Sequence, residues 1–181
     1  MSKDQFIVAI VGMVITALGI IIPLIMAVLQ LKKNYEWEKA MLAVELNKIW
    51  SEKTLPHRNI IEKKYGPYIS NLKPIAPPDC EEFVNSVEGS PLFPIKLAVI
   101  ALMNYFEDIA VLYTSGMADK GIVDATLRRP MTRYYEKIKP LSGCIDKVAG
   151  SPAWKPLDDL MAIWKLQDSQ KELGLKSKRF P

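Results

Sequence analysis

A single uncharged run dominates the hydrophobic pattern of this chain, because no residue from Gln5 to Leu31 carries a charge. As an α-helix at about 1.5 Å per residue the run would extend roughly 40 Å, more than the ~30 Å hydrocarbon core of a bilayer. We interpret it as one membrane-spanning helix. A cleaved signal peptide is disfavoured, because the apolar core is too long and continues into Lys32 and Lys33 without a small-residue cleavage site. A buried helix of a soluble domain is also disfavoured, since an uncharged run of this length is unusual in a small domain.

One face of the predicted helix carries only small or polar residues, and we call it the small-residue stripe. At about 100° per residue, its positions fall within an arc of about 80° and follow one another in steps of three and four. They are Gln5, Ala9, Gly12, Thr16, Gly19, Pro23, Ala27, Gln30 and Asn34. Small residues let helix backbones approach closely, and polar residues form hydrogen bonds between helices. The stripe therefore predicts helix-to-helix contact with left-handed packing.

The simplest partner for a single span is another copy of the same chain. If three or more copies met along the stripe, as in a tetramer, Thr16, Gln30 and the carbonyls near Pro23 would line a narrow path through the membrane. The residues predicted to pack or line this path are Ala9, Gly12, Thr16, Gly19, Pro23, Ala27 and Gln30. A dimer, or packing against a different protein, would use the same stripe without conduction.

Helical patterns account for the rest of the chain. Residues 34–55 contain no glycine or proline and are rich in helix formers, which predicts that the span continues as one helix until just before Pro56. Asp79 and Asp119 are placed as N-caps, and Pro130 is expected to break or kink a helix. The longest soluble helix is expected between Ser90 and Gly116, and its nearly continuous apolar sequence predicts the centre of a core. Later helices are expected over residues 131–148 and from 151 to about 174.

No strand alternation or internal repeat is present in the sequence, so we predict an all-α fold. Residues 1–33 form the membrane helix with a short external N-terminus, and residues 34–55 form its helical extension. Residues 56–174 form a cytosolic helical domain, followed by a basic tail over 175–181.

Charge predicts the orientation of the span. Lys32, Lys33 and Lys39 lie just after it, whereas Lys3 before it is offset by Asp4, and the positive-inside rule then predicts that the C-terminal side is cytoplasmic. The overall charge of +4 is too small to indicate nucleic-acid binding by bulk charge. The two cysteines, Cys80 and Cys144, are far apart and lack metal-binding spacing, which favours free thiols in a reducing compartment.

One basic segment is the candidate ligand-binding site. Its residues are Arg128, Arg129, Arg133, Tyr134, Tyr135 and Lys137. Arginine forms paired hydrogen bonds with phosphate, and tyrosine rings stack on bases, so the segment has the side chains that a nucleotide-like ligand requires. A solvated helix face and a contact with acidic lipid head groups explain the same residues.

Nothing in the sequence supports an enzyme, a metal site or a cofactor. His57 is the only histidine, and there is no glycine-rich phosphate loop or nucleophile elbow. We therefore assign no catalytic residues and expect no cofactor.

The segment 102–110, LMNYFEDIA, followed by Gly116 and by residues 122–124, resembles a family of small bacterial proteins with one N-terminal span and a helical cytosolic domain. Proteins of this layout are similar to membrane effectors of anti-phage defence, such as the Hailong type. That system pairs a channel-forming effector with a nucleotidyltransferase whose oligonucleotide product holds the channel shut. The resemblance implies an oligomeric channel controlled by a nucleic-acid-like ligand, and it assigns no ligand residues.

Together these features predict an oligomeric membrane effector that forms a regulated ion-conducting pore. Its expected partners are other copies of itself, membrane lipid, and either an oligonucleotide or nucleotide that inhibits or activates it or a cytosolic regulatory protein. The competing hypothesis is a single-span, membrane-anchored helical scaffold without a pore.

Overall fold

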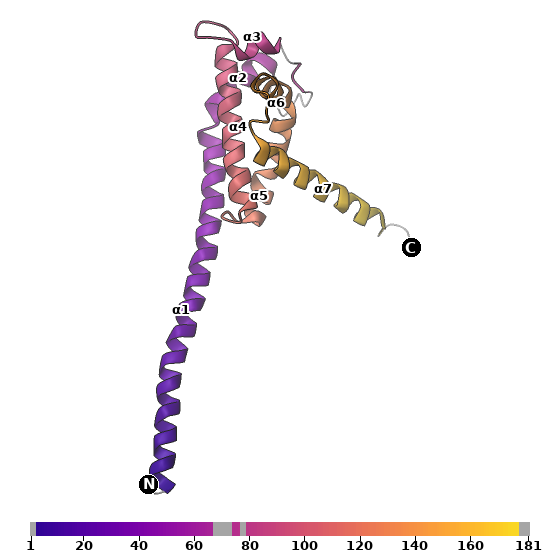
Figure 1. The fold of residues 1–181 in the computed structure, drawn as a ribbon. Helices are drawn as coiled ribbons and strands as arrows, with labels where there is room; N and C mark the ends of the chain where they lie inside the picture. Colours follow the sequence, from indigo (N-terminus) through magenta and orange to yellow (C-terminus); the bar gives the residue numbers. More distant parts are fainter. Residues whose placement is uncertain (1–2, 67–73, 77–78, 178–181) are drawn as a thin grey trace. The chain divides into compact units, whose positions relative to one another are not determined.

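The fold is that of a computed structural model, which describes residues 3–66, 74–76 and 79–177, with the side chains of 3–12, 14–15 and 172–177 left out. Within these ranges the chain forms seven helices and no strand (Figure 1), which confirms the predicted all-α fold. The helices are α1 (Lys3–Glu52), α2 (Leu55–Tyr65), α3 (Cys80–Val84), α4 (Phe93–Thr114), α5 (Lys120–Thr126), α6 (Arg128–Ala149) and α7 (Lys155–Ser177). The chain divides into two compact units, Met1–Met41 and Leu42–Pro181, and the boundary falls inside α1.

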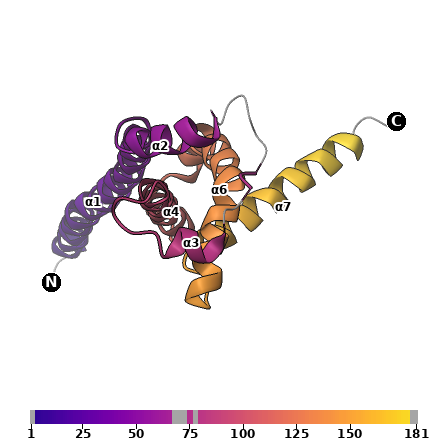
Figure 2. The same cartoon turned by 90° about the horizontal axis from the view of Figure 1, so that it is seen from above.

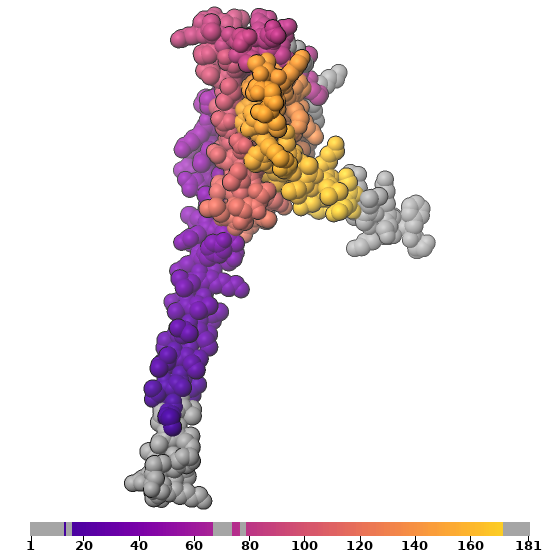
Figure 3. Space-filling model, in the orientation of Figure 1, coloured from indigo at the N-terminus to yellow at the C-terminus, as the bar shows by residue number. Residues whose placement is uncertain are grey.

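The first unit is the N-terminal part of α1. Among the described residues, α1 is the one helix that is long and apolar enough to cross a membrane. Every side chain from residue 16 to 38 is exposed within the protomer, and in the space-filling view the described side chains stand out along the helix (Figure 3). The helix continues through Pro23. A wholly exposed run of Ile, Leu, Val and Met side chains needs lipid or other protein to cover it.

The second unit is a helical domain centred on α4. This helix contacts α2, α3, α6 and α7, which are arranged around it in the view from above (Figure 2). Nine of its side chains are buried, as the apolar pattern between Ser90 and Gly116 predicted. The rings of Trp50 and Phe106 lie 5.6 Å apart, and those of Trp50 and Tyr134 lie 5.9 Å apart in an edge arrangement. This aromatic cluster joins the end of α1 to α4 and α6.

Two helix starts agree with their predicted caps, and one predicted break is wrong. Asp79 and Asp119 accept hydrogen bonds from the backbone N–H groups of Glu82 and Ile122, at 3.0 and 2.9 Å. Pro130, in contrast, does not break a helix, because α6 begins at Arg128 and places it in the first turn. Backbone N–H groups in a first turn have no partner within the helix, so a proline there removes no hydrogen bond.

The expectation of free thiols is also wrong. Cys80 at the start of α3 and Cys144 on α6 form a disulfide across 64 residues of sequence, with their Cα atoms 4.9 Å apart. The spacing of two cysteines does not reveal such a pairing, because the bond depends on how α3 packs on α6. Cysteine use therefore no longer supports a reducing compartment, and the predicted orientation of the candidate span depends on its flanking lysines alone.

Candidate ligand site between α6 and α7

Two adjoining cavities lie between α6 and α7, and they share Thr132 and Asp168. The larger has a volume of about 550 Å³ and the smaller about 410 Å³. Residues 128, 132, 135 and 139 of α6 follow one another in steps of three and four, so they share the helix face that lines these cavities. The combined volume is in the usual range for small-molecule sites.

The smaller cavity is basic, and we call it the basic cavity. Its charged residues are Arg128, Arg129, Arg133, Lys171, Asp124 and Asp168. Four cations face two carboxylates there, and no ion pair joins Arg129, Arg133 or Lys171 to a described residue. An anion entering this cavity would meet three cations that form no ion pair with a described residue.

Arg128 has a different role, because its guanidinium is committed to the protein. It donates to the Trp164 carbonyl at 2.7 Å, to Gln167 Oε1 at 2.9 Å and to Asp168 Oδ1 at 2.7 Å, and lies 4.0 Å from Asp124 Oδ1. Its side chain is only 12% exposed. These contacts hold α7 against the first turn of α6, so Arg128 shapes the cavity, whereas Arg129 and Arg133 remain available to a ligand.

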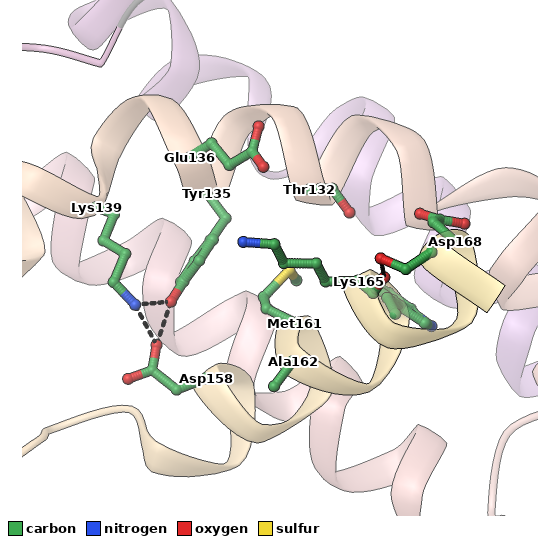
Figure 4. Close-up of a pocket in the computed structure, with 11 residues that line it drawn as sticks. Thr132, Tyr135, Glu136, Lys139, Asp158, Met161, Ala162, Lys165 and Asp168 are labelled. Carbon is green, nitrogen blue, oxygen red and sulfur yellow. Dashed lines mark hydrogen bonds and ion pairs between the residues drawn. The ribbon is translucent and has the colours of Figure 1, made fainter. Parts of the chain in front are cut away.

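The larger cavity contains a hydrogen-bonded group of three side chains (Figure 4). The Tyr135 hydroxyl donates to Asp158 Oδ1, and Lys139 Nζ donates to the same hydroxyl and, at 3.1 Å, to Asp158. Burial raises the pKa of Tyr135 to about 12, reinforced by the Asp158 carboxylate. The phenol is therefore neutral near pH 7 and is unsuited to act as a base. In Figure 4, Lys165 and Met161 lie between this group and Thr132.

Two residues of the predicted site lie elsewhere. Tyr134 is fully buried, and its hydroxyl donates to Glu62 Oε1 at 3.0 Å. Lys137 is 1% exposed and donates to the Gly66 carbonyl at 2.6 Å, while its own carbonyl accepts from the Ile75 N–H. Burial lowers the pKa of Lys137. Both side chains point to the opposite face of α6 from Arg128 and Tyr135, where they hold α2 and the segment after it, and they cannot reach a ligand in the cavities.

The structure adds residues that the sequence reasoning did not include in the site. Asp158, Lys165, Asp168 and Lys171 enter the two cavities from α7. Their spacing along α7 is helical, but only the packing of α7 on α6 shows that they face the basic segment. Among the described residues, no group of three or more His, Cys, Asp or Glu side chains is arranged to hold a metal ion.

On α1 the predicted small-residue stripe is described only in part. Thr16, Gly19, Pro23, Ala27 and Gln30 are exposed on α1, and nothing lies within 4 Å of a Cβ built at Gly19. At Ala9 and Gly12 the structure describes the helical backbone alone. The protomer thus leaves the described positions of the stripe uncovered.

The segment that carries the family resemblance is structural in this fold. Asn104 Oδ1 accepts from Trp154 Nε1 at 2.7 Å, just before α7 begins, and the Tyr105 hydroxyl donates to the Leu46 carbonyl on α1. Phe106 is fully buried against Trp50. The three residues therefore fix α1 and α7 to the central helix.

The fold and cavities define an all-α protein with one candidate membrane helix and a helical domain that contains a basic cavity. A family model described as "Domain of unknown function (DUF4760)" matches residues 7–164, and the chain belongs to this family. No curated protein matches the chain, and no solved structure matches it.

Proposed function

We propose that this protein is an oligomeric effector of the bacterial inner membrane that forms a regulated ion-conducting pore. The observation that carries the proposal is the uncovered apolar surface of α1, where all side chains from residue 16 to 38 are exposed within the protomer. The described positions of the small-residue stripe are exposed within the protomer, so the stripe can pack against other copies. The flanking lysines favour an external N-terminus and a cytoplasmic helical domain.

The conducting path would follow the stripe. Proline has no N–H, so the carbonyl of Gly19, four residues before Pro23, receives no helical hydrogen bond from it. Such a carbonyl is tolerated in a membrane where it faces water or protein. Together with Thr16 and Gln30 it gives a polar lining to a closed ring of helices, whereas the large aliphatic side chains of the other faces contact lipid.

The basic cavity supports regulation by an anionic, nucleotide-like ligand. Arg129, Arg133 and Lys171 supply charge for phosphate, and the adjoining cavity offers Met161 and the aliphatic part of Lys165 to a base or sugar. A ligand that enters the cavities would change how α7 packs against α6. An acidic segment of a cytosolic regulatory protein would satisfy the same charges. The likeness to effectors of anti-phage defence favours the nucleotide and suggests defence as the cellular role.

The second candidate function is a membrane-anchored scaffold, favoured by the additional cavities on the helical domain, which offer surfaces for protein contact. Membrane potential distinguishes the two functions. On induction in bacterial cells, a pore collapses the signal of a potential-sensitive dye within the time of expression, whereas a tether leaves it unchanged. An intact potential in cells that contain the protein in their inner membrane would refute the pore.

For the ligand site we expect the double variant Arg129→Glu, Arg133→Glu to retain a labelled oligonucleotide at least tenfold less than the parent chain. Neither arginine forms an ion pair with a described residue, so their loss removes phosphate contacts and leaves the packing of Arg128 in place. The dependence of binding on salt should also become shallower, because each phosphate contact releases counterions. Filter retention by the purified chain at several salt concentrations measures both effects.

The matched control is Lys63→Glu, Lys147→Glu, which changes net charge by the same amount at exposed lysines outside both cavities. It should bind as the parent does. Equal retention by the parent and the arginine variant would remove the nucleotide site.

A further inference from the structure

An apolar groove runs along the helical domain between the end of α1 and α4. Its volume is about 500 Å³, and it is lined by Leu42, Glu45, Leu46, Ile49, Lys53, Tyr105, Asp108, Val111 and Leu112. Val111 in this groove is 46% exposed. The groove is distinct from the cavities between α6 and α7 and shares no residue with them.

Beside this groove, α1 presents a ridge made by Val44 and Lys48. Val44 is 55% exposed and Lys48 is also exposed, and residues four apart lie on one side of a helix. The opposite side of α1 is buried in its own domain through Ala43, Leu46 and Trp50. At about 100° per residue, the ridge and the groove are therefore neighbouring surfaces of the same helix.

The groove and the ridge carry opposite charges. In the groove Glu45 and Asp108 form no ion pair with a described residue, and Lys48 on the ridge forms none either. The other charged residue that lines the groove is Lys53, so two carboxylates outweigh one cation and the net charge of the groove is negative. Measured along the axis of α1 at about 1.5 Å per residue, Lys48 is about 4.5 Å from Glu45 and about 7.5 Å from Lys53. Lys48 is therefore closer in height to the acidic residue than to the basic one.

We propose that the groove is occupied by the Val44 and Lys48 ridge of a second copy of this chain. A rotation about an axis parallel to α1 moves each copy sideways without changing its height. Lys48 of one copy then meets the groove of the next near Glu45 and Asp108, and Val44 covers Val111 or Ile49. Because the two surfaces differ, every copy offers one ridge and one groove, and such a head-to-tail contact forms a ring when the rotation between neighbours divides a full turn.

This inference rests on the proposed assembly of copies and adds a contact outside the membrane to it. The charge pair sets the register between neighbours, since like charges at the same height would repel. The ring would also hold the α1 helices parallel where they leave the domain.

Disulfide cross-linking in membranes tests the contact in the full-length protein. Two differently tagged chains, one Val44→Cys and one Val111→Cys, are coexpressed and oxidised with copper phenanthroline. We expect a cross-linked dimer that contains both tags. Coexpression of Val111→Cys with Val148→Cys, which is exposed on α6, is the control and should give none. Adding Lys48→Glu should reduce the cross-link several-fold, and Asp108→Lys in the partner chain should restore it.

Each outcome is decisive. If Val44→Cys chains cross-link to one another as well as they do to Val111→Cys, α1 meets α1 symmetrically and the groove is not the site. If the detergent complex is oligomeric by size and no mixed cross-link forms, the groove contact is wrong while the proposed assembly remains. If the purified chain is a monomer in detergent and in membranes, both are wrong.

Discussion

Cells that express the Gly19→Leu chain are expected to keep their membrane potential, whereas cells that express the parent chain lose it. The leucine adds bulk to the small-residue stripe, where close approach of helix backbones is required. Nothing lies within 4 Å of a Cβ at Gly19 in the protomer, so the substitution leaves the single chain undisturbed and acts only between copies. A potential-sensitive dye after induction measures the effect, and light scattering of the detergent complex should show a smaller assembly.

The chain offers a matched control two residues away. Ala17 is also small and exposed on α1, but it lies on a different face of the helix, about 120° from the centre of the stripe. Ala17→Leu should therefore depolarise cells as the parent does. Adding Gly12→Leu to Gly19→Leu should abolish any depolarisation that the single variant still causes. Full depolarisation by the Gly19→Leu chain at parental expression would show that the stripe does not carry the contact.

Local chemistry explains which parts of the fold could be predicted from the sequence. Asp79 and Asp119 cap α3 and α5 because a short carboxylate side chain satisfies a free N–H three residues later, and this depends only on neighbouring residues. The burial of α4 follows from its composition, because a helix that is apolar on all its faces needs contacts on several sides. Such features are fixed within one helical turn or one helix.

The site could be predicted only in part, because it depends on how distant helices pack. Tyr134 and Tyr135 are adjacent and chemically alike, yet one bonds Glu62 in the core and the other Asp158 beside the cavity. Their directions differ by about 100° around α6, so residues that are neighbours in the sequence lie on two different faces of the helix. Arg128 and Arg129 also differ in role. Among the described residues, α7 supplies hydrogen-bond partners for Arg128 and none for Arg129.

The same reasoning explains why the cysteine interpretation failed. A disulfide between residues 64 positions apart is decided by the packing of α3 on α6, which sequence spacing does not report. Cys80 is half-buried, whereas Cys144 is almost fully buried. Cys80 is thus the more accessible of the two residues, and we expect a reductant to reach the bond from its side.

Replacing Cys80 with serine is expected to lower the free energy of unfolding of the helical domain by roughly 4 kcal/mol, from the entropy of closing a loop of this length in the unfolded chain. Serine at the half-buried Cys80 avoids placing a hydroxyl in the core, as it would at Cys144. Urea unfolding of the oxidised protein in detergent, followed by tryptophan fluorescence, measures the loss. Reduction should destabilise the parent by a similar amount and leave Cys80→Ser unchanged, and a parent insensitive to reductant would contradict the prediction.

The same bond makes the orientation of the span measurable. The flanking lysines favour a cytoplasmic helical domain, and thiols are kept reduced in the cytoplasm. We therefore expect a membrane-permeant maleimide to label Cys80 in growing cells without added reductant, and the domain there to lack the stability that the disulfide adds. A domain on the outer side of the membrane would be labelled only after reduction. Labelling of that second kind would reverse the orientation and place the basic cavity beyond the reach of a cytosolic nucleotide, so this measurement decides whether the proposed ligand can meet its site.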